Sequence, residues 1–93
     1  MKLANIQSAK KRIRQTVKRT EHNRVYRSSA RTYVKQTRRH MAAGDFDEAE
    51  VTARLAYKAL DKAARKWVIH PRNAARRKGR LMAALEKARA EAA

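Results

Sequence analysis

The sequence contains no cysteine, one proline, two glycines and five aromatic residues among its 93 residues. The lack of cysteine excludes a disulfide framework, a thiolate metal site and a cysteine nucleophile, and it is compatible with a reducing compartment. Because proline and glycine are scarce, few positions interrupt regular structure. No apolar run is long enough for a transmembrane helix, and residues 1–7 do not resemble a secretory signal. A small single domain with a thin core is therefore expected.

Acidic residues are also few, since 8 Asp and Glu face 25 Lys and Arg, for a net charge of +17. The excess is uneven. Residues 1–40 contain 13 basic residues and one acidic residue, and residues 64–80 contain seven basic residues and no acidic one. The intervening residues 41–63 have a net charge of −2, and residues 81–93 are neutral. Self-repulsion of this size favours binding to a polyanion. The charge distribution predicts two basic elements that face a common anion.

Helical spacing of apolar residues is common, whereas strand-like alternation is not sustained anywhere. We expect a tail at residues 1–7, then helices at about residues 8–41, 46–67 and 71–90. Short joints make neighbouring helices antiparallel. The predicted fold class is all-α, an up-down-up three-helix bundle with a long, overhanging basic first helix.

The ends of these helices are marked by particular residues. Ser8 is a plausible N-cap of the first helix, and Gly44 is the natural left-handed residue after its end. Asp45 and Glu48 fit a capping box at the start of the second helix. Pro71 fits the first position of the third helix.

One apolar face on each helix is expected to form the core. Trp67 continues the face of the second helix and is interpreted as a core residue near the second joint; stacking on a nucleobase is the alternative. The three tyrosines are interpreted as packing residues. The predicted core positions are Tyr26, Ala30, Tyr33, Val34, Thr37 and Met41; Ala49, Ala53, Ala56, Leu60, Ala63 and Trp67, widened by Val51, Leu55 and Ala59; and Ala74, Leu81, Met82, Leu85 and Ala88.

The first helix is about 50 Å long at 1.5 Å per residue, but the second covers only about its last 22 residues. Residues up to about Arg19 are therefore expected to project as a basic arm, which is marginally stable alone. Polar residues at its start could hydrogen-bond RNA, although capping is the more ordinary role for Ser8. The candidate RNA-binding residues of this part are Asn5, Ser8, Lys10, Lys11, Arg12, Arg14, Lys18 and Arg19.

A row of basic residues at steps of three and four follows the later part of the first helix. The row lies next to the apolar face, because consecutive residues of a helix are rotated by about 100° around its axis. A solvated face usually mixes both signs of charge, but only Glu21 is acidic here, so the row indicates phosphate contact. The row consists of Arg24, Arg27, Arg31, Lys35 and Arg38.

The first half of the third helix has the same character. Arginines at a helix N-terminus oppose the helix dipole, so an external anion explains them better than solubility does, and the backbone amides there can also hold a phosphate. The candidate RNA-binding residues are His70, Arg72, Asn73, Arg76, Arg77, Lys78 and Arg80.

No catalytic arrangement is recognisable. His22, His40 and His70 show no spacing typical of metal ligands. No nucleophile–base pair or glycine-rich phosphate loop is present, and capping explains the acidic residues. We expect no catalytic residue, no metal site and no cofactor, and therefore not an enzyme.

Two segments carry a specific pattern: residues 4–12, ANIQSAKKR, and residues 68–81, VIHPRNAARRKGRL. They resemble two motifs of the bacterial small-subunit ribosomal protein family numbered twenty, and the resemblance covers essentially the whole chain. It implies a three-helix bundle that binds small-subunit ribosomal RNA directly, early in assembly, and touches more than one RNA domain. Lys2-Leu3, Pro71 and Gly79 depart from the family pattern. Carried over by motif, the residues at RNA are Asn5, Ser8, Lys10, Lys11 and Arg12, with His70, Asn73, Arg76, Arg77 and Lys78.

The prediction is one rRNA-binding domain, residues 1–93, which is a structural constituent of the small ribosomal subunit in the cytoplasm. It would bridge RNA segments by replacing counterions along their phosphates. Few protein contacts, no membrane and no small-molecule substrate are expected. The alternative is a sequence-nonspecific DNA-binding helical protein, although a helix-turn-helix needs a short recognition helix. A membrane-surface helix would need more bulky apolar residues than Ile6, Ile13 and Val17.

Overall fold

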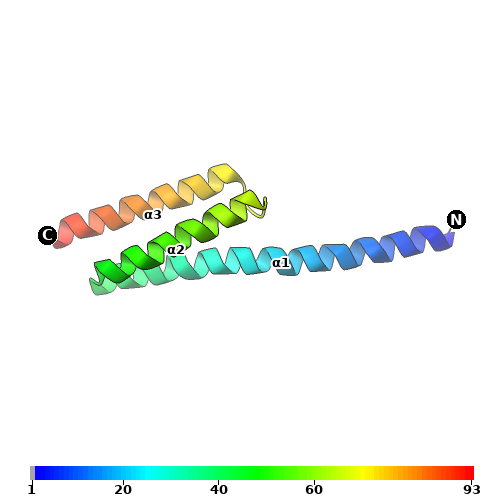
Figure 1. Cartoon of the computed structure of the whole chain (residues 1–93), viewed down its shortest axis with the longest axis horizontal. Helices are drawn as coiled ribbons and strands as arrows, with labels where there is room; N and C mark the ends of the chain where they lie inside the picture. The colour runs from blue at the N-terminus through cyan, green and yellow to red at the C-terminus, as the bar shows by residue number, and fades with distance from the viewer. Residues whose placement is uncertain (1) are drawn as a thin grey trace.

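The computed structural model describes the backbone of residues 2–93 and the side chains of residues 6–93. It consists of three helices, α1 (Lys2–Ala43), α2 (Phe46–Arg65) and α3 (Pro71–Ala92), and the described residues include no strand. The chain reverses at each joint, so neighbouring helices are antiparallel and α2 lies between α1 and α3 (Figure 1). The predicted all-α, up-down-up bundle with a long, overhanging first helix is confirmed.

The three helices lie side by side in a layer and do not pack as a closed three-helix triangle in cross-section. α2 packs along both neighbours, whereas α1 and α3 touch each other at few points. The Cα trace accordingly measures 71 × 22 × 14 Å. One side of the layer therefore lacks the direct α1–α3 packing that would close it.

The core is thin and built mainly from alanines, which let the helices approach closely. Ala30 of α1, Leu60 of α2 and Ala74 of α3 form one buried cluster, so a single leucine joins all three helices. A second buried cluster lies along α2 and α3, with Tyr33, Val34 and Met41 of α1 packed against it. Its buried members are Ala49, Ala53, Ala56, Leu81 and Leu85.

Two ion pairs join α2 to α3. Glu50 accepts a hydrogen bond from Arg89 at 2.7 Å, and Asp61 accepts from Lys78 at 3.0 Å. The bond from Arg89, the charge of Arg89 and that of Arg54 hold the pKa of the Glu50 carboxyl below its usual value. The contacts of Glu50 therefore favour the fold at neutral pH and are lost as the pH falls through its lowered pKa. Such exposed pairs stabilise little and mainly orient the helices.

The start of α1 differs from the prediction. The helix already begins at Lys2, so the expected tail at residues 1–7 is wrong for residues 2–7, and Ser8 lies inside the helix, exposed, and is not an N-cap. The physical reason is that no proline or glycine precedes Gly44, so nothing stops the helix from extending toward the N-terminus.

The first joint keeps one predicted feature and loses another. Gly44 has a φ of +81° and closes α1 as the left-handed residue after its end. The capping box is wrong, because Asp45 has φ −87° and ψ 72° and makes no side-chain cap hydrogen bond. The Asp45 amide instead donates to the His40 carbonyl at 2.9 Å. Glu48 pairs with the His40 imidazole at 3.3 Å and does not reach back to the Asp45 amide.

α2 ends at Arg65, two residues before the predicted end. The Trp67 and Val68 amides donate to the Ala64 and Ala63 carbonyls, which is the hydrogen-bond pattern of a Schellman motif. This turn gives Trp67 a φ of +57° and leaves its side chain 72% exposed. The predicted core role of Trp67 is therefore wrong, because the chain leaves the helical path before reaching it. Val68 is buried in its place.

The apolar face of α2 is narrower than predicted. Ala49, Ala53, Ala56, Leu60 and Ala63 are buried as expected. The expectation that Val51 and Leu55 widen this face is wrong, because both side chains are exposed. A helix in the middle of a layer has neighbours on two sides only, so its remaining surface faces water. On α3, the predicted Met82 is likewise exposed.

Candidate nucleic-acid interface

A groove of about 710 Å³ lies where α1 and α3 fail to meet. Its apolar surface comes from residues of all three helices and of the second joint, among them Ala30, Val34, Leu60, Ile69 and Leu81. Five arginines also line it, three from α1 and two from α3. They are Arg27, Arg31, Arg38, Arg77 and Arg80. No acidic side chain of the described chain lines this groove, so its rims carry charge of one sign.

The helical repeat explains which members of the α1 row reach the groove. At about 100° per residue, Arg27, Arg31 and Arg38 fall within about 40° of one another around the axis. Lys35 lies further round the helix and is exposed, and Arg24 borders a separate, shallower depression. The sequence pattern correctly placed the row beside the apolar face, and the structure separates it into groove residues and outer residues.

Arg27 also has a structural contact. Its guanidinium donates to the Val68 carbonyl at 3.2 Å, so it ties α1 to the second joint. Removing Arg27 would disturb the fold and the charge together. Arg31 has no such hydrogen bond in the described part of the chain and is the better probe of binding.

The second joint and α3 supply the opposite side of the groove. His70 caps α3, because its Nδ1 accepts a hydrogen bond from the Arg72 amide at 3.1 Å. Asn73 lines the groove one turn before Arg77, and its side-chain oxygen is buried with no hydrogen-bond partner in the structure. This bond gives His70 a structural role at the start of α3.

Three predicted residues of α3 lie outside this groove. Arg72 and Arg76 are exposed on a neighbouring face. Lys78 points to α2, where both carboxylate oxygens of Asp61 accept from its ammonium at 3.0 Å. That pair could not be predicted from the sequence, because the partners are 17 residues apart on different helices.

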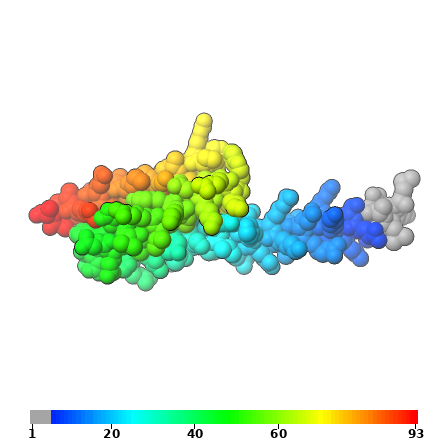
Figure 2. All heavy atoms as spheres, viewed as in Figure 1, coloured from blue at the N-terminus to red at the C-terminus, as the bar shows by residue number. Residues whose placement is uncertain are grey.

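The overhang, defined here as residues 6–22 of α1, projects beyond the bundle as a single rod (Figure 2). Every side chain from Ile6 to His22 is exposed. The candidate RNA-binding residues of this part lie here, six of them basic: Ser8, Lys10, Lys11, Arg12, Arg14, Lys18 and Arg19. Asn5 belongs to the α1 backbone, and its side chain lies outside the described residues. The prediction of an unpartnered basic arm is confirmed, and the arm extends three residues further than expected.

Within the part of the chain whose side chains are described, no residue of the bundle packs against the overhang to hold it helical. Lys10, Arg14 and Lys18 are like charges four residues apart, which destabilises a helix. Thr16 and Thr20 bond only to carbonyls one turn back. An isolated helix of this length is marginal in water, and neutralisation of its charge would stabilise it.

We expect the backbone amides of the overhang to exchange hydrogen rapidly in the free protein and at least about tenfold more slowly when RNA is bound. Hydrogen exchange measured by NMR or mass spectrometry tests this. The amides around Leu60 are the internal control and should be protected in both states. Equal protection of the overhang and of α2 in the free protein would contradict the prediction.

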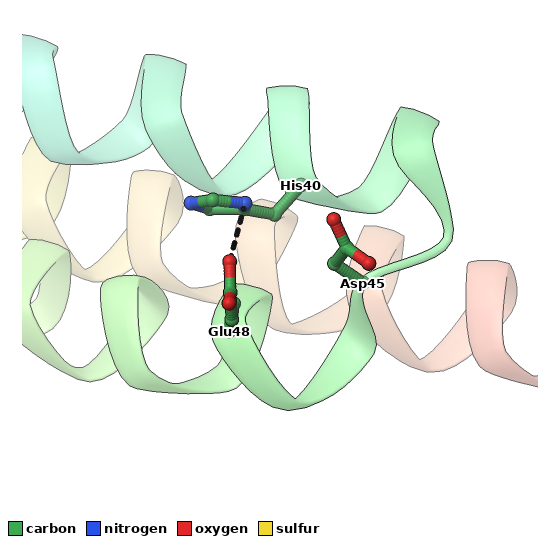
Figure 3. Close-up of side chains that lie close together, drawn as sticks. All are labelled: His40, Asp45 and Glu48. Carbon is green, nitrogen blue, oxygen red and sulfur yellow. Dashed lines mark ion pairs between the residues drawn. The ribbon is translucent and has the colours of Figure 1, made fainter.

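A further group of side chains gathers at the first joint. His40, Asp45 and Glu48 place one potential metal-ligand atom each within 4.8 Å of one another. Figure 3 shows the three side chains converging from the end of α1, the turn and the start of α2, with the His40–Glu48 ion pair dashed. Sequence spacing missed this group because the turn brings it together. The ion pair accounts for the arrangement as a link between α1 and α2, since exposed acidic groups commonly gather without a metal.

None of the described helices carries an apolar stretch that could span a lipid bilayer.

The chain is similar to known ribosomal proteins over most of its length. The family model described as "Ribosomal protein S20" matches residues 4–86. A protein of Coprothermobacter proteolyticus named small ribosomal subunit protein bS20 is 46% identical over 80 residues, which cover 86% of this chain and 91% of that protein. Proteins of the same name are 46% identical in Legionella pneumophila strain Corby, over 90% of this chain and 96% of the relative, and in Thermomicrobium roseum, over 94% and 91%.

Proposed function

This chain belongs to the ribosomal protein S20 family, and from that premise we propose that it is a structural constituent of the small ribosomal subunit that binds its ribosomal RNA directly. The protein is not an enzyme, and as part of the ribosome it works in the cytoplasm. The observation that carries the proposal is the groove between α1 and α3, with five arginines and no acidic side chain among its described lining. Such a surface favours the binding of a polyanion.

RNA phosphates fit the groove for two reasons. Guanidinium groups form paired, charge-assisted hydrogen bonds with phosphate oxygens. Arg31 of α1 and Arg80 of α3 line the same groove, which supports contact of both helices with one RNA backbone. Each contact also releases condensed counterions, which favours binding at low salt. Recognition of this kind depends on backbone shape more than on base edges, because the major groove of A-form RNA is closed to side chains.

The overhang gives the second contact region. The bundle and the overhang share one continuous helix in a molecule 71 Å long. RNA bound in the groove and RNA bound along the overhang can therefore belong to segments that are distant in the RNA sequence. We infer that the protein bridges such segments during assembly. Its exposed surface is dominated by basic side chains, so we also infer few protein contacts and no small-molecule substrate.

Footprinting of small-subunit rRNA with and without the protein tests the proposal. We expect protection of at least two separated RNA segments, and a binding constant that falls by about 0.7–0.9 log units per log unit of salt for each phosphate contact. An overhang truncated before Thr20 should lose one group of protections and keep the other. Absence of protection would overturn the proposal. Equal affinity for duplex DNA at matched salt would also overturn it, in favour of nonspecific nucleic-acid binding.

A further inference from the structure

Trp67 is the only tryptophan of the chain and has an unusual conformation. It is the one residue other than glycine with a positive φ among the residues that the structure describes. The left-handed region is unfavourable for a side chain with a Cβ atom, and glycine is the usual residue at this position of a Schellman motif. A large aromatic residue here costs stability that glycine would not.

Packing does not account for the indole. Its side chain is 72% exposed, and the neighbouring Val68 supplies the buried apolar group of the turn. The fold thus gains little from Trp67 and keeps it in a strained conformation. Strained residues that packing does not explain point to a role in binding.

Three hydrogen bonds hold the turn around Trp67. Two backbone hydrogen bonds close it, and the Arg27 guanidinium fixes the Val68 carbonyl. The His70 ring meets the indole edge to face, with centroids 5.8 Å apart and an interplanar angle of 87°. Because His70 is itself held by the Arg72 amide, the indole has a braced neighbour on one side and water over most of its surface.

The charge around the turn indicates what the indole meets. No acidic residue occurs between Asp61 and Glu86, whereas Arg65, Lys66 and Arg72 flank the turn. The turn lies at the end of the bundle from which the overhang projects, in the corner between two basic elements (Figure 1). Basic surroundings of this kind favour a ligand that carries phosphates.

We propose that Trp67 is a stacking platform for one unpaired nucleobase of the RNA bound by the basic surface. This inference rests on the proposed function and adds to it the class of nucleotide that is recognised. Bases within an A-form helix do not expose their faces, so the ligand is a bulged, loop or terminal nucleotide beside a helix. Stacking on an aromatic ring tolerates any base, because every base has a π face.

Fluorescence excited at wavelengths where the three tyrosines do not absorb reports on this single residue. Full-length protein is titrated with small-subunit rRNA while binding is followed independently by filter retention. We expect strong quenching of the indole emission that follows the binding curve. If RNA binds and the emission is unchanged or shifts to shorter wavelength, as burial against protein would produce, the inference is overturned and the proposed function stands. If no RNA binds, the proposed function itself fails.

Substitution separates stacking from charge. Trp67→Gly suits the left-handed backbone and should weaken rRNA binding about tenfold, with the salt dependence unchanged because no phosphate contact is lost. Trp67→Phe should restore most of the affinity. Val51→Ala, which removes another exposed apolar group at the opposite end of α2, is the matched control and should bind like the unsubstituted protein. Unchanged affinity of Trp67→Gly would overturn the inference.

Discussion

Replacing Arg31 and Arg80 together by alanine should weaken binding to small-subunit rRNA about a hundredfold. The two guanidinium groups line the groove from α1 and α3, and a hydrogen bond to a charged group is worth about 1.5 kcal/mol or more, so two lost contacts give this factor. The slope of log affinity against log salt should also fall by about 1.4–1.8, since two phosphate contacts disappear. Equilibrium binding measured across a salt series tests both numbers.

The folded state should survive this change. Both side chains are exposed, neither makes a hydrogen bond within the described chain, and alanine is the best helix former. The matched control is Lys58→Ala with Lys87→Ala, which removes the same charge from exposed positions outside the groove. If the control weakens binding as much as the groove variant does, net charge and not the groove determines affinity. A groove variant that loses helix content would show that these arginines support the fold.

Replacing Leu60 by alanine should destabilise the free protein by about 3 kcal/mol. Leu60 is 0% exposed and contacts the buried alanines of the other two helices, which are too small to move into the space that it leaves. A domain of this size has a free energy of unfolding of about 5–10 kcal/mol, so the loss is a large share of the total. Urea unfolding followed by circular dichroism measures it.

Val51→Ala provides the comparison for Leu60→Ala. It lies on the same helix and also shortens an apolar side chain, but Val51 is exposed and its loss should change the free energy of unfolding by less than about 0.5 kcal/mol. A loss below about 1 kcal/mol for Leu60→Ala would mean that the three helices do not depend on this residue. It would also mean that the alanine contacts alone hold the layer together.

The sequence predicted the helices and their order because these depend on local signals. Gly44 and Pro71 mark the joints, and the spacing of Ala49, Ala53, Ala56 and Leu60 defines one buried face. The length of the overhang followed from simple arithmetic on helix rise. The periodicity of apolar residues predicted burial wrongly at two kinds of position. At Trp67 the chain has already left the helix, and at Val51 the helix has no neighbouring helix on that side within the described part of the chain.

The groove could be predicted only in part. The arginine row on α1 and the cluster on α3 were visible in the sequence. The sequence did not show that these two groups of arginines line one groove, because this depends on α3 packing against α2 and hardly touching α1. Long-range contacts such as Lys78 with Asp61 and Arg27 with the Val68 carbonyl were likewise invisible. The hydrogen bond that Asp45 fails to make shows that a suitable residue does not ensure the backbone geometry of a cap.

The missing contact between α1 and α3 has a thermodynamic consequence. Guanidinium groups on the two helices repel each other across the gap, and the packing of both helices on α2 is the main interaction that opposes this repulsion. Added salt screens the repulsion and so strengthens the free fold, while the same salt weakens the grip on RNA. A rise in ionic strength therefore increases the stability of the free protein and decreases its affinity for the RNA of the small ribosomal subunit.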